Sequence, residues 1–342
     1  MSLKQRIEDG ISGKFQGLAN GFDRLNKYIF GIQRGVYMLL GGQSGTFKTT
    51  LCDFMITNAL KDAEEQGIEL NIFYYSYEID AISKKCNWLS SIIFQKYDII
   101  IPPEKIKGLG DNRLTKEEKE LVDSEIDYVE SLFEKINFRF KSTNPTGIYN
   151  EIWKFFSIKG TFEYENYTDK EGVIKQKIKR YVPNNLDSYT LVVLDHLLLL
   201  LKERGYNDKE VLDKYSEYCV ELRNMFGCSF INVSQFNDGL STVDRAKFKG
   251  VDLSPQMTDF KSTRNPYADA DVVLGTMCPY KLDMDKCLGY DINKLKSNMI
   301  MLKILKNRLS TDNIGIGLYV NPKSGSFKEL PKPSEINYGD YI

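Results

Sequence analysis

The sequence predicts an α/β fold in which a mostly parallel, twisted β-sheet carries helices on both faces. Three observations predict it. Short apolar strands alternate with segments of helical periodicity from residue 36 to residue 234, a glycine-rich turn joins the first strand to the first helix, and two further strands, 316–320 and 326–329, follow near the C-terminus. Strands that alternate with helices form parallel sheets, because each connecting helix packs on a face of the sheet. The last two strands are expected to form a β-hairpin.

Hydrophobic periodicity predicts the individual elements. Short apolar runs indicate buried strands, and apolar residues at helical spacing indicate helices. The expected elements are strand 36–40, helix 49–61, strand 71–76, a helical region 80–135 interrupted near Pro102 and Pro103, strand 136–140, strand 190–194, helix 208–226, and strands 229–234, 272–275 and 299–305. Residues 236–268 are rich in Gly, Ser, Thr, Asp and Lys, which predicts a long polar loop.

Two segments depart from this alternation. Residues 1–30 carry Leu3, Ile7 and Ile11 at helical spacing and predict an amphipathic arm before one large domain over 31–335. Residues 160–188 alternate with period two around a turn at 169–172, which predicts a surface β-hairpin insertion. Its basic residues either contact DNA or a partner, or form a solvated strand edge that resists aggregation. These residues are Lys175, Lys177, Lys179 and Arg180.

Composition excludes several functional classes. The chain has 342 residues, and its 46 Lys and Arg against 47 Asp and Glu give a net charge of −1, which excludes a wholly basic nucleic-acid coat. One histidine and six cysteines without a C-x-x-C pair suggest neither a zinc site nor a disulfide framework. The longest apolar stretch, 191–201, is interrupted by Asp195 and His196, so no membrane span is expected. The charged first ten residues lack a signal sequence, which predicts a cytoplasmic protein.

The glycine-rich turn predicts a phosphate-binding loop. Gly42-Gln43-Ser44-Gly45-Thr46-Phe47-Lys48-Thr49 follows a strand and opens a helix, as a P-loop must. Backbone N–H groups and the helix N-terminus surround phosphate oxygens there, Lys48 reaches the β- and γ-phosphates of ATP, and the Thr49 hydroxyl binds Mg²⁺. Thr50 completes the expected nucleotide-binding set. The alternative is a strand-to-helix turn that binds nothing.

Phe47 is the departure from the P-loop pattern, which has glycine at this position. A bulky residue is tolerable only if its backbone needs no positive φ and its ring turns away from the nucleotide.

Three polar residues at predicted strand ends extend this site. Asp195 ends an apolar strand and is expected to hold Mg²⁺ beside Thr49, although it could instead cap a helix. Glu78 follows another strand and could orient the attacking water, or be an ordinary solvated side chain. Gln235 could hydrogen-bond the γ-phosphate, or be merely a strand-end amide.

Taken together, these residues resemble the RecA-like ATPase core of the DnaB-type replicative helicases, including the phage and mitochondrial members. The resemblance covers residues 20–330. Its motifs, in chain order, are Gly42–Thr49, Ser76-Tyr77-Glu78, Leu194-Asp195-His196, Val233-Ser234-Gln235, the loop from Thr258-Asp259-Phe260-Lys261 to Ala268-Asp269-Ala270-Asp271-Val272-Val273, and Lys306-Asn307-Arg308.

The resemblance implies a ring, usually a hexamer, in which each ATP lies between neighbouring subunits. Arg308 would be the arginine finger and Lys306 its companion, unless the pair is a solvated basic turn. Lys261 matches a basic residue of the family's central DNA-contacting loop, and Arg264 is an extra basic candidate beside it. The loop that carries Lys202 and Arg204 would line the same channel. Because such a channel needs few cations per subunit, a near-zero net charge is no objection.

The sequence therefore predicts an ATP- and Mg²⁺-dependent DNA helicase or translocase that acts on single-stranded DNA as a homo-oligomer in DNA replication, with a primase or loader as a possible partner. The chain shows no N-terminal collar domain, a build that suits a bacteriophage protein working in the host cytoplasm. The alternatives are a RecA-type recombinase, a KaiC-like regulatory ATPase, or a non-catalytic nucleotide-binding scaffold.

Overall fold

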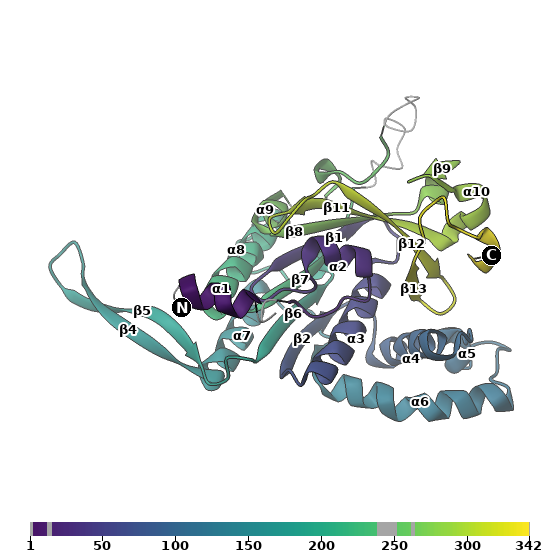
Figure 1. The fold of residues 1–342 in the computed structure, drawn as a ribbon. Helices are drawn as coiled ribbons and strands as arrows, with labels where there is room; N and C mark the ends of the chain where they lie inside the picture. The colour runs from purple at the N-terminus through teal and green to yellow at the C-terminus, as the bar shows by residue number, and fades with distance from the viewer. Residues whose placement is uncertain (1–2, 12–15, 238–251, 261–263, 342) are drawn as a thin grey trace.

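The fold is built on one large β-sheet, seen in a computed structural model that describes residues 3–11, 16–237, 252–260 and 264–341 (Figure 1). Nine strands form this sheet. Their spatial order is β13 (Ser326–Glu329), β12 (Ile314–Asn321), β11 (Met299–Asn307), β8 (Val272–Met277), β1 (Tyr37–Gly42), β7 (Ser229–Gln235), β6 (Tyr189–Asp195), β2 (Leu70–Ser76) and β3 (Ile136–Arg139). Strands β8 to β3 in this order pair in parallel, whereas β11, β12 and β13 are antiparallel. The predicted mostly parallel sheet with a C-terminal hairpin is confirmed.

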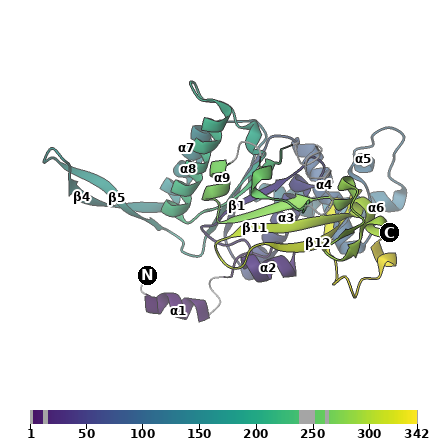
Figure 2. The same cartoon turned by 90° about the horizontal axis from the view of Figure 1, so that it is seen from above.

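Helices cover both faces of the sheet, as the alternation predicts (Figure 2). One face packs against α3 (Lys48–Gln66), α4 (Ala81–Tyr97) and α6 (Lys116–Glu134), and the other packs against α7 (Pro145–Lys159) and α8 (Asp208–Phe226). Alternate residues of β1 serve the two cores, since Met38 and Leu40 point to the first and Tyr37 and Leu39 to the second. The central strand is therefore buried along its whole length.

Several short elements were not expected from the periodicity. Helix α7 is one, although its start carries two ordinary signals: the Asn144 side chain accepts the Gly147 N–H, and Pro145 occupies the first turn. The other elements are α2 (Asp23–Ile29), α5 (Pro103–Ile106), α9 (Arg264–Asp269), α10 (Ile292–Leu295), β9 (Lys286–Cys287), β10 (Tyr290–Asp291) and the 3₁₀ turns 197–199, 257–259, 279–282, 296–298 and 338–341. Within the loop expected over 236–268, residues 238–251 and 261–263 lie outside the described residues, and the rest includes α9 and an isolated β-bridge between Phe236 and Phe260.

The packed unit begins before residue 31. Leu3–Ile11 forms the expected helix, α1, but Leu18, Phe22 and Leu25 are buried in the same core as α3. The Tyr28 carbonyl also accepts a hydrogen bond from the Asn307 side chain on β11. Residues from Leu18 onward thus pack with the sheet, because their apolar side chains cover its edge.

The predicted hairpin insertion is confirmed as β4 (Gly160–Thr168) and β5 (Ile174–Pro183), a ribbon that projects from the body of the molecule (Figures 1 and 2). Its basic side chains pair with carboxylates of the same hairpin: Arg180 with Glu163 at 2.6 Å and Lys177 with Glu165 at 3.1 Å. Lys175 pairs with Asp169 at 2.6 Å. These pairs favour the solvated-edge interpretation over a DNA contact.

In the described part of the chain, no helix has the length and apolar character needed to cross a membrane.

A buried ion pair joins α3 to α4. Lys84 is completely buried, and its Nζ donates to the Asp53 carboxylate at 2.8 and 3.0 Å. The Tyr74 hydroxyl of β2 donates to the same carboxylate at 2.6 Å, and its ring lies 4.2 Å from the Lys84 ammonium. A buried pair is costly to break, because removal of one partner leaves the other charge unpaired in a low dielectric.

Lys84→Met should therefore lower the free energy of unfolding by about 3–5 kcal/mol. The double variant Lys84→Met with Asp53→Leu should recover most of that loss, because it removes both charges. Urea unfolding followed by far-UV circular dichroism measures both. Lys61→Met is the matched control, since the exposed Lys61–Glu65 pair should contribute less than about 1 kcal/mol. Equal destabilisation in the single and double variants would contradict this account.

Candidate active site

The loop between β1 and α3 is fixed against β8. The buried Thr46 hydroxyl donates to the Gln43 carbonyl at 2.8 Å and lies 2.9 Å from the Thr276 hydroxyl of β8. A Cβ on Gly42 would collide with both threonine hydroxyls, so this position needs glycine. Gly45 has a φ of +68°, which glycine adopts without strain. The loop conformation is therefore set before any ligand binds.

Phe47 corrects one expectation. It was expected to be tolerable only without a positive φ, yet it adopts φ 59° and ψ 30°, immediately before the first residue of α3. The left-handed conformation costs a non-glycine residue about 1–2 kcal/mol. The ring packs against the core beneath α3, and this apolar contact offsets the strain. The missing glycine is thus compatible with a formed loop.

Lys48 lies folded onto its own loop. Its Nζ donates to the Gln43 carbonyl at 2.8 Å. Burial lowers the pKa of Lys48, while the carboxylates of Glu78 and Asp195 act in the opposite direction. An ammonium held by one neutral carbonyl can exchange that partner for a phosphate oxygen, which gives a stronger, charge-assisted hydrogen bond.

Strand register brings the other predicted site residues to the same edge of the sheet. Gln235 at the end of β7 is paired with Gly42, where the loop starts. Asp195 at the end of β6 is paired with Ser76 of β2, and the exposed Glu78 follows two residues later. Thr49 Oγ1 donates to Asp195 Oδ1 at 3.1 Å. The side chains of Lys48, Thr49, Asp195, Glu78 and Gln235 thus belong to one edge, as predicted.

Asp195 has the properties of a cation ligand. It is fully buried, and its Oδ2 finds no hydrogen-bond partner among the described residues. Burial raises the pKa of Asp195 to about 7, and the nearby charges of Asp53 and Glu78 raise it further. A divalent cation would relieve both effects. Carboxylate and hydroxyl oxygens are the donors that Mg²⁺ prefers, so Asp195 and Thr49 fit this ion.

Two further polar groups at these strand ends were missed as site residues. His196 Nδ1 accepts the Leu198 N–H at 3.2 Å, but its buried Nε2 has no partner within the described chain, and the same is true of Ser234 Oγ. Burial lowers the pKa of His196 to about 4, with the Lys48 charge acting in the same direction. A neutral imidazole with an unpaired buried nitrogen suits water or a ligand. Their motif positions were the available signal.

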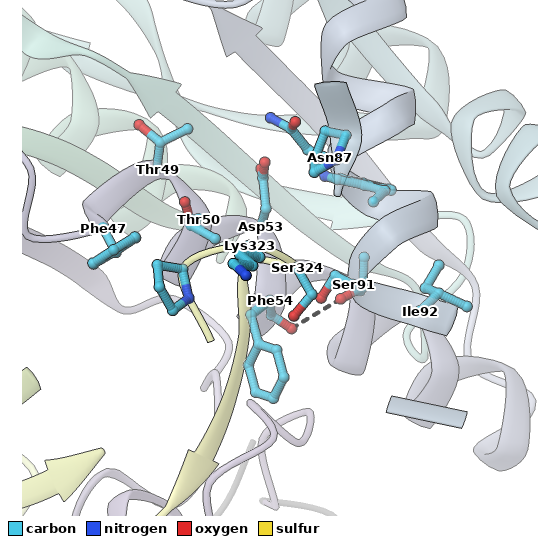
Figure 3. Close-up of a pocket in the computed structure, with 15 residues that line it drawn as sticks. Phe47, Thr49, Thr50, Asp53, Phe54, Asn87, Ser91, Ile92, Lys323 and Ser324 are labelled. Carbon is cyan, nitrogen blue, oxygen red and sulfur yellow. Dashed lines mark hydrogen bonds between the residues drawn. The ribbon is translucent and has the colours of Figure 1, made fainter. Parts of the chain in front are cut away.

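A cavity of about 190 Å³ adjoins the loop (Figure 3). Residues of α3, α4 and the turn between β12 and β13 line it: Phe47, Thr49, Thr50, Asp53, Phe54, Thr57, Asn87, Trp88, Ser91, Ile92, Pro103, Pro322, Lys323, Ser324 and Gly325. The turn comes close to α3, because a Cβ on Gly325 would lie 2.9 Å from Thr50 Cγ2. Residues distant in sequence therefore extend the site beyond the loop.

Lys306 and Arg308 lie elsewhere, at the junction of α9 and β8. Lys306 Nζ donates to the Ala268 carbonyl at 2.6 Å, and Arg308 Nη2 donates to the same carbonyl at 3.0 Å. Arg308 also pairs with Asp271 at 3.2 Å, and half of its side chain is exposed. Within one chain, neither cation contacts the phosphate loop.

The DNA-binding candidates are placed only in part. Lys202 and Arg204 are exposed in the segment between β6 and α8, where Lys202 pairs with Asp208 at 3.0 Å. Lys261 lies outside the described residues, and Arg264 is described only as the first residue of α9.

The sheet order, the loop after the central strand and the polar strand ends define a RecA-like P-loop ATPase fold. Two solved structures share it. The ATPase domain of a phage helicase aligns with a TM-score of 0.68 and 15% identity, over 96% of this chain and 99% of that domain. A DnaB-like replicative helicase, solved in a study of its interactions with primase, aligns with a TM-score of 0.69 and 14% identity, over 96% of this chain and 68% of its own. The resemblance in fold to the DnaB-type core is confirmed.

A KaiC-like protein of Pyrococcus horikoshii OT3 aligns with a TM-score of 0.49 and 16% identity, over 93% of this chain and 100% of its own. No family model and no curated protein matches the sequence.

The strain at Phe47 leads to a stability prediction. Phe47→Ala removes the ring and keeps a left-handed Cβ, whereas Phe47→Gly removes both the ring and the strain. Both variants should be less stable than the native chain, but the glycine variant should be more stable than the alanine variant by about 1 kcal/mol. The free energies of unfolding in urea test this order. A more stable alanine variant would show that position 47 is unstrained.

Proposed function

We propose that this chain is a Mg²⁺-dependent ATP hydrolase that acts on single-stranded DNA as a helicase or translocase in replication. The observation that supports it best is the buried, unpaired Asp195 Oδ2 beside the Thr49 hydroxyl, next to a formed phosphate loop. A structural strand end has no use for a desolvated carboxylate, whereas a hydrolase needs one to hold its metal.

Each residue of the edge has a role in this proposal. The loop N–H groups of residues 42–50 surround the phosphates, and Lys48 leaves the Gln43 carbonyl for the β- and γ-phosphates. Mg²⁺, held by Thr49 and Asp195, would neutralise charge on the same phosphates. Glu78 orients the attacking water, and Gln235 hydrogen-bonds the γ-phosphate. The cavity beside Thr50 offers room for part of the nucleoside.

We propose a ring in which Arg308 and Lys306 serve a neighbouring subunit. Both cations are held by carbonyls of the α9–β8 junction, and the half-exposed Arg308 guanidinium could reach outward from it. Positive charge supplied across a subunit boundary stabilises the transition state of phosphoryl transfer. Lys202, Arg204, Lys261 and Arg264 are our candidates for contacts to a DNA strand in the central channel. Since the DnaB-like neighbour was studied with primase, a primase is a candidate partner here too.

Lys48→Ala tests the loop. This variant should lose at least about 100-fold in DNA-stimulated ATPase activity, because the phosphates lose their charged partner. Phosphate release measured with and without single-stranded DNA gives the result. Lys61→Ala, an exposed change on the same helix, should leave activity unaltered. Undiminished turnover in Lys48→Ala would refute the assignment of the loop, and a wild-type chain that binds ATP without hydrolysing it would be a scaffold.

Mixing variants tests the neighbour's contribution. Arg308→Ala should bind nucleotide normally but hydrolyse it slowly, because its own loop is intact. Mixed with Lys48→Ala, it should recover ATPase activity that neither variant has alone, since mixed rings pair an intact loop with an intact arginine. Negative-stain images with ATP and single-stranded DNA should show rings. A chain that remains a monomer under all these conditions, with mixtures that stay inactive, would exclude the ring mechanism.

Strand-displacement assays distinguish a helicase from a recombinase. We expect unwinding of a forked duplex in the presence of ATP and Mg²⁺. Strand exchange without displacement would favour the recombinase instead.

A further inference from the structure

A second lysine lies on the phosphate loop, from a part of the chain that the sequence motifs do not include. Lys281 Nζ donates to the Gly45 carbonyl at 3.0 Å. A Cβ built on Gly45 would lie 2.5 Å from this Nζ. Apart from Lys281 and the loop's own adjoining residues, nothing in the described chain comes within 4 Å of that point. The ammonium therefore stands alone over the middle of the loop.

The position of Lys281 is determined by its surroundings. It belongs to the 3₁₀ turn Pro279–Leu282, which directly follows β8, the strand whose Thr276 contacts the loop. Pro279 is buried, and Leu282 packs against a separate small core around Met277, Tyr290 and Ile292. The Lys281 N–H also donates to the Cys278 carbonyl at 3.2 Å. The backbone of this turn is thus anchored on one side, while the exposed lysine side chain extends to the loop.

The two lysines resemble each other in their contacts. Lys48 donates to the carbonyl of residue 43 and Lys281 to the carbonyl of residue 45, so each ammonium is held by a neutral group of the same loop. The charge on Lys281 contributes to the lowered pKa of Lys48, so the two cations repel each other. A bound polyphosphate would relieve this repulsion and offer both side chains a stronger partner.

We propose that Lys281 is a second phosphate-binding lysine, which joins Lys48 at the β- and γ-phosphates from within the same subunit. This inference rests on the proposed ATPase function. It differs from the contribution of Arg308, because Lys281 already contacts the loop within one chain. The long, flexible stem lets Nζ leave the Gly45 carbonyl for a phosphate oxygen without movement of the anchored turn.

A merely structural role makes a different prediction. If Lys281 only supports the loop, a neutral donor at this position would replace it. Lys281→Gln keeps a donor for the Gly45 carbonyl but removes the charge, and Lys281→Arg keeps the charge. The matched control is Lys286→Gln, which removes an exposed lysine from β9 in the same small subdomain.

The probes are the Mg²⁺ complexes of ADP and of the β,γ-imido analogue of ATP, with dissociation constants measured by calorimetry on the full chain. Lys281→Gln should weaken the analogue about tenfold or more, and ADP distinctly less, because the analogue carries the additional phosphate. The loss should diminish at high salt. The ATPase kcat should fall in parallel, while Lys281→Arg and Lys286→Gln should stay close to wild type.

Wild-type binding and turnover in Lys281→Gln would overturn the inference and leave the proposed function standing. Equal weakening of the analogue and ADP, independent of salt and without a change in kcat, would also overturn it in favour of a structural support. A wild-type chain that binds neither nucleotide would instead refute the proposed function itself.

Discussion

The site depends on the position of β1 between β7 and β8. The two ladders place Gly42 opposite Gln235 on one side and opposite Thr276 on the other. Because β1 is buried on both faces and paired on both edges, the start of the loop cannot shift without breaking backbone hydrogen bonds. This constraint determines where the loop begins, which strand ends flank it, and how the turn after β8 reaches it.

Charges around the loop are separated by sign. The carboxylates of Asp195, Glu78 and Asp53 belong to one set of elements, and the ammonium groups of Lys48 and Lys281 lie on the loop itself. A cation beside Asp195 and a polyanion beside the lysines would each find an opposite charge. The raised pKa of Asp195 and the lowered pKa of Lys48 are the costs of holding these groups in place without such partners.

Buried polar groups connect the site to the scaffold. Asp53 lies one helical turn after Thr49, and its pair with Lys84 holds α4 against α3 close to the end of β2. Since Glu78 lies between β2 and α4, this pair also restrains the segment that carries it. Thr46 and Thr276 connect the loop to β8 in a similar way. Stability and site geometry thus depend on the same few contacts.

Local patterns were sufficient for the sheet, the principal helices and the hairpin insertion. Alternating apolar runs follow from burial, and the turn at 169–172 from the period-two strands around it, so neither needs distant contacts. The same patterns missed α7, whose capping residues were present but were overlooked. Motif spacing also predicted which of Lys48, Thr49, Asp195, Glu78 and Gln235 would meet at one edge, because parallel strands bring their carboxyl ends together.

Other features were decided by tertiary structure alone. The left-handed Phe47 is stable only because the core beneath α3 receives its ring, and that core is assembled from several elements. The Lys84–Asp53 pair and the contact of Lys281 with Gly45 join segments distant in the chain, so no local pattern contains them. The sequence by itself determined the periodicities and the loop chemistry, since these depend on neighbouring residues. Only folding decided which charges lie together, because burial and electrostatic interaction depend on distance in space.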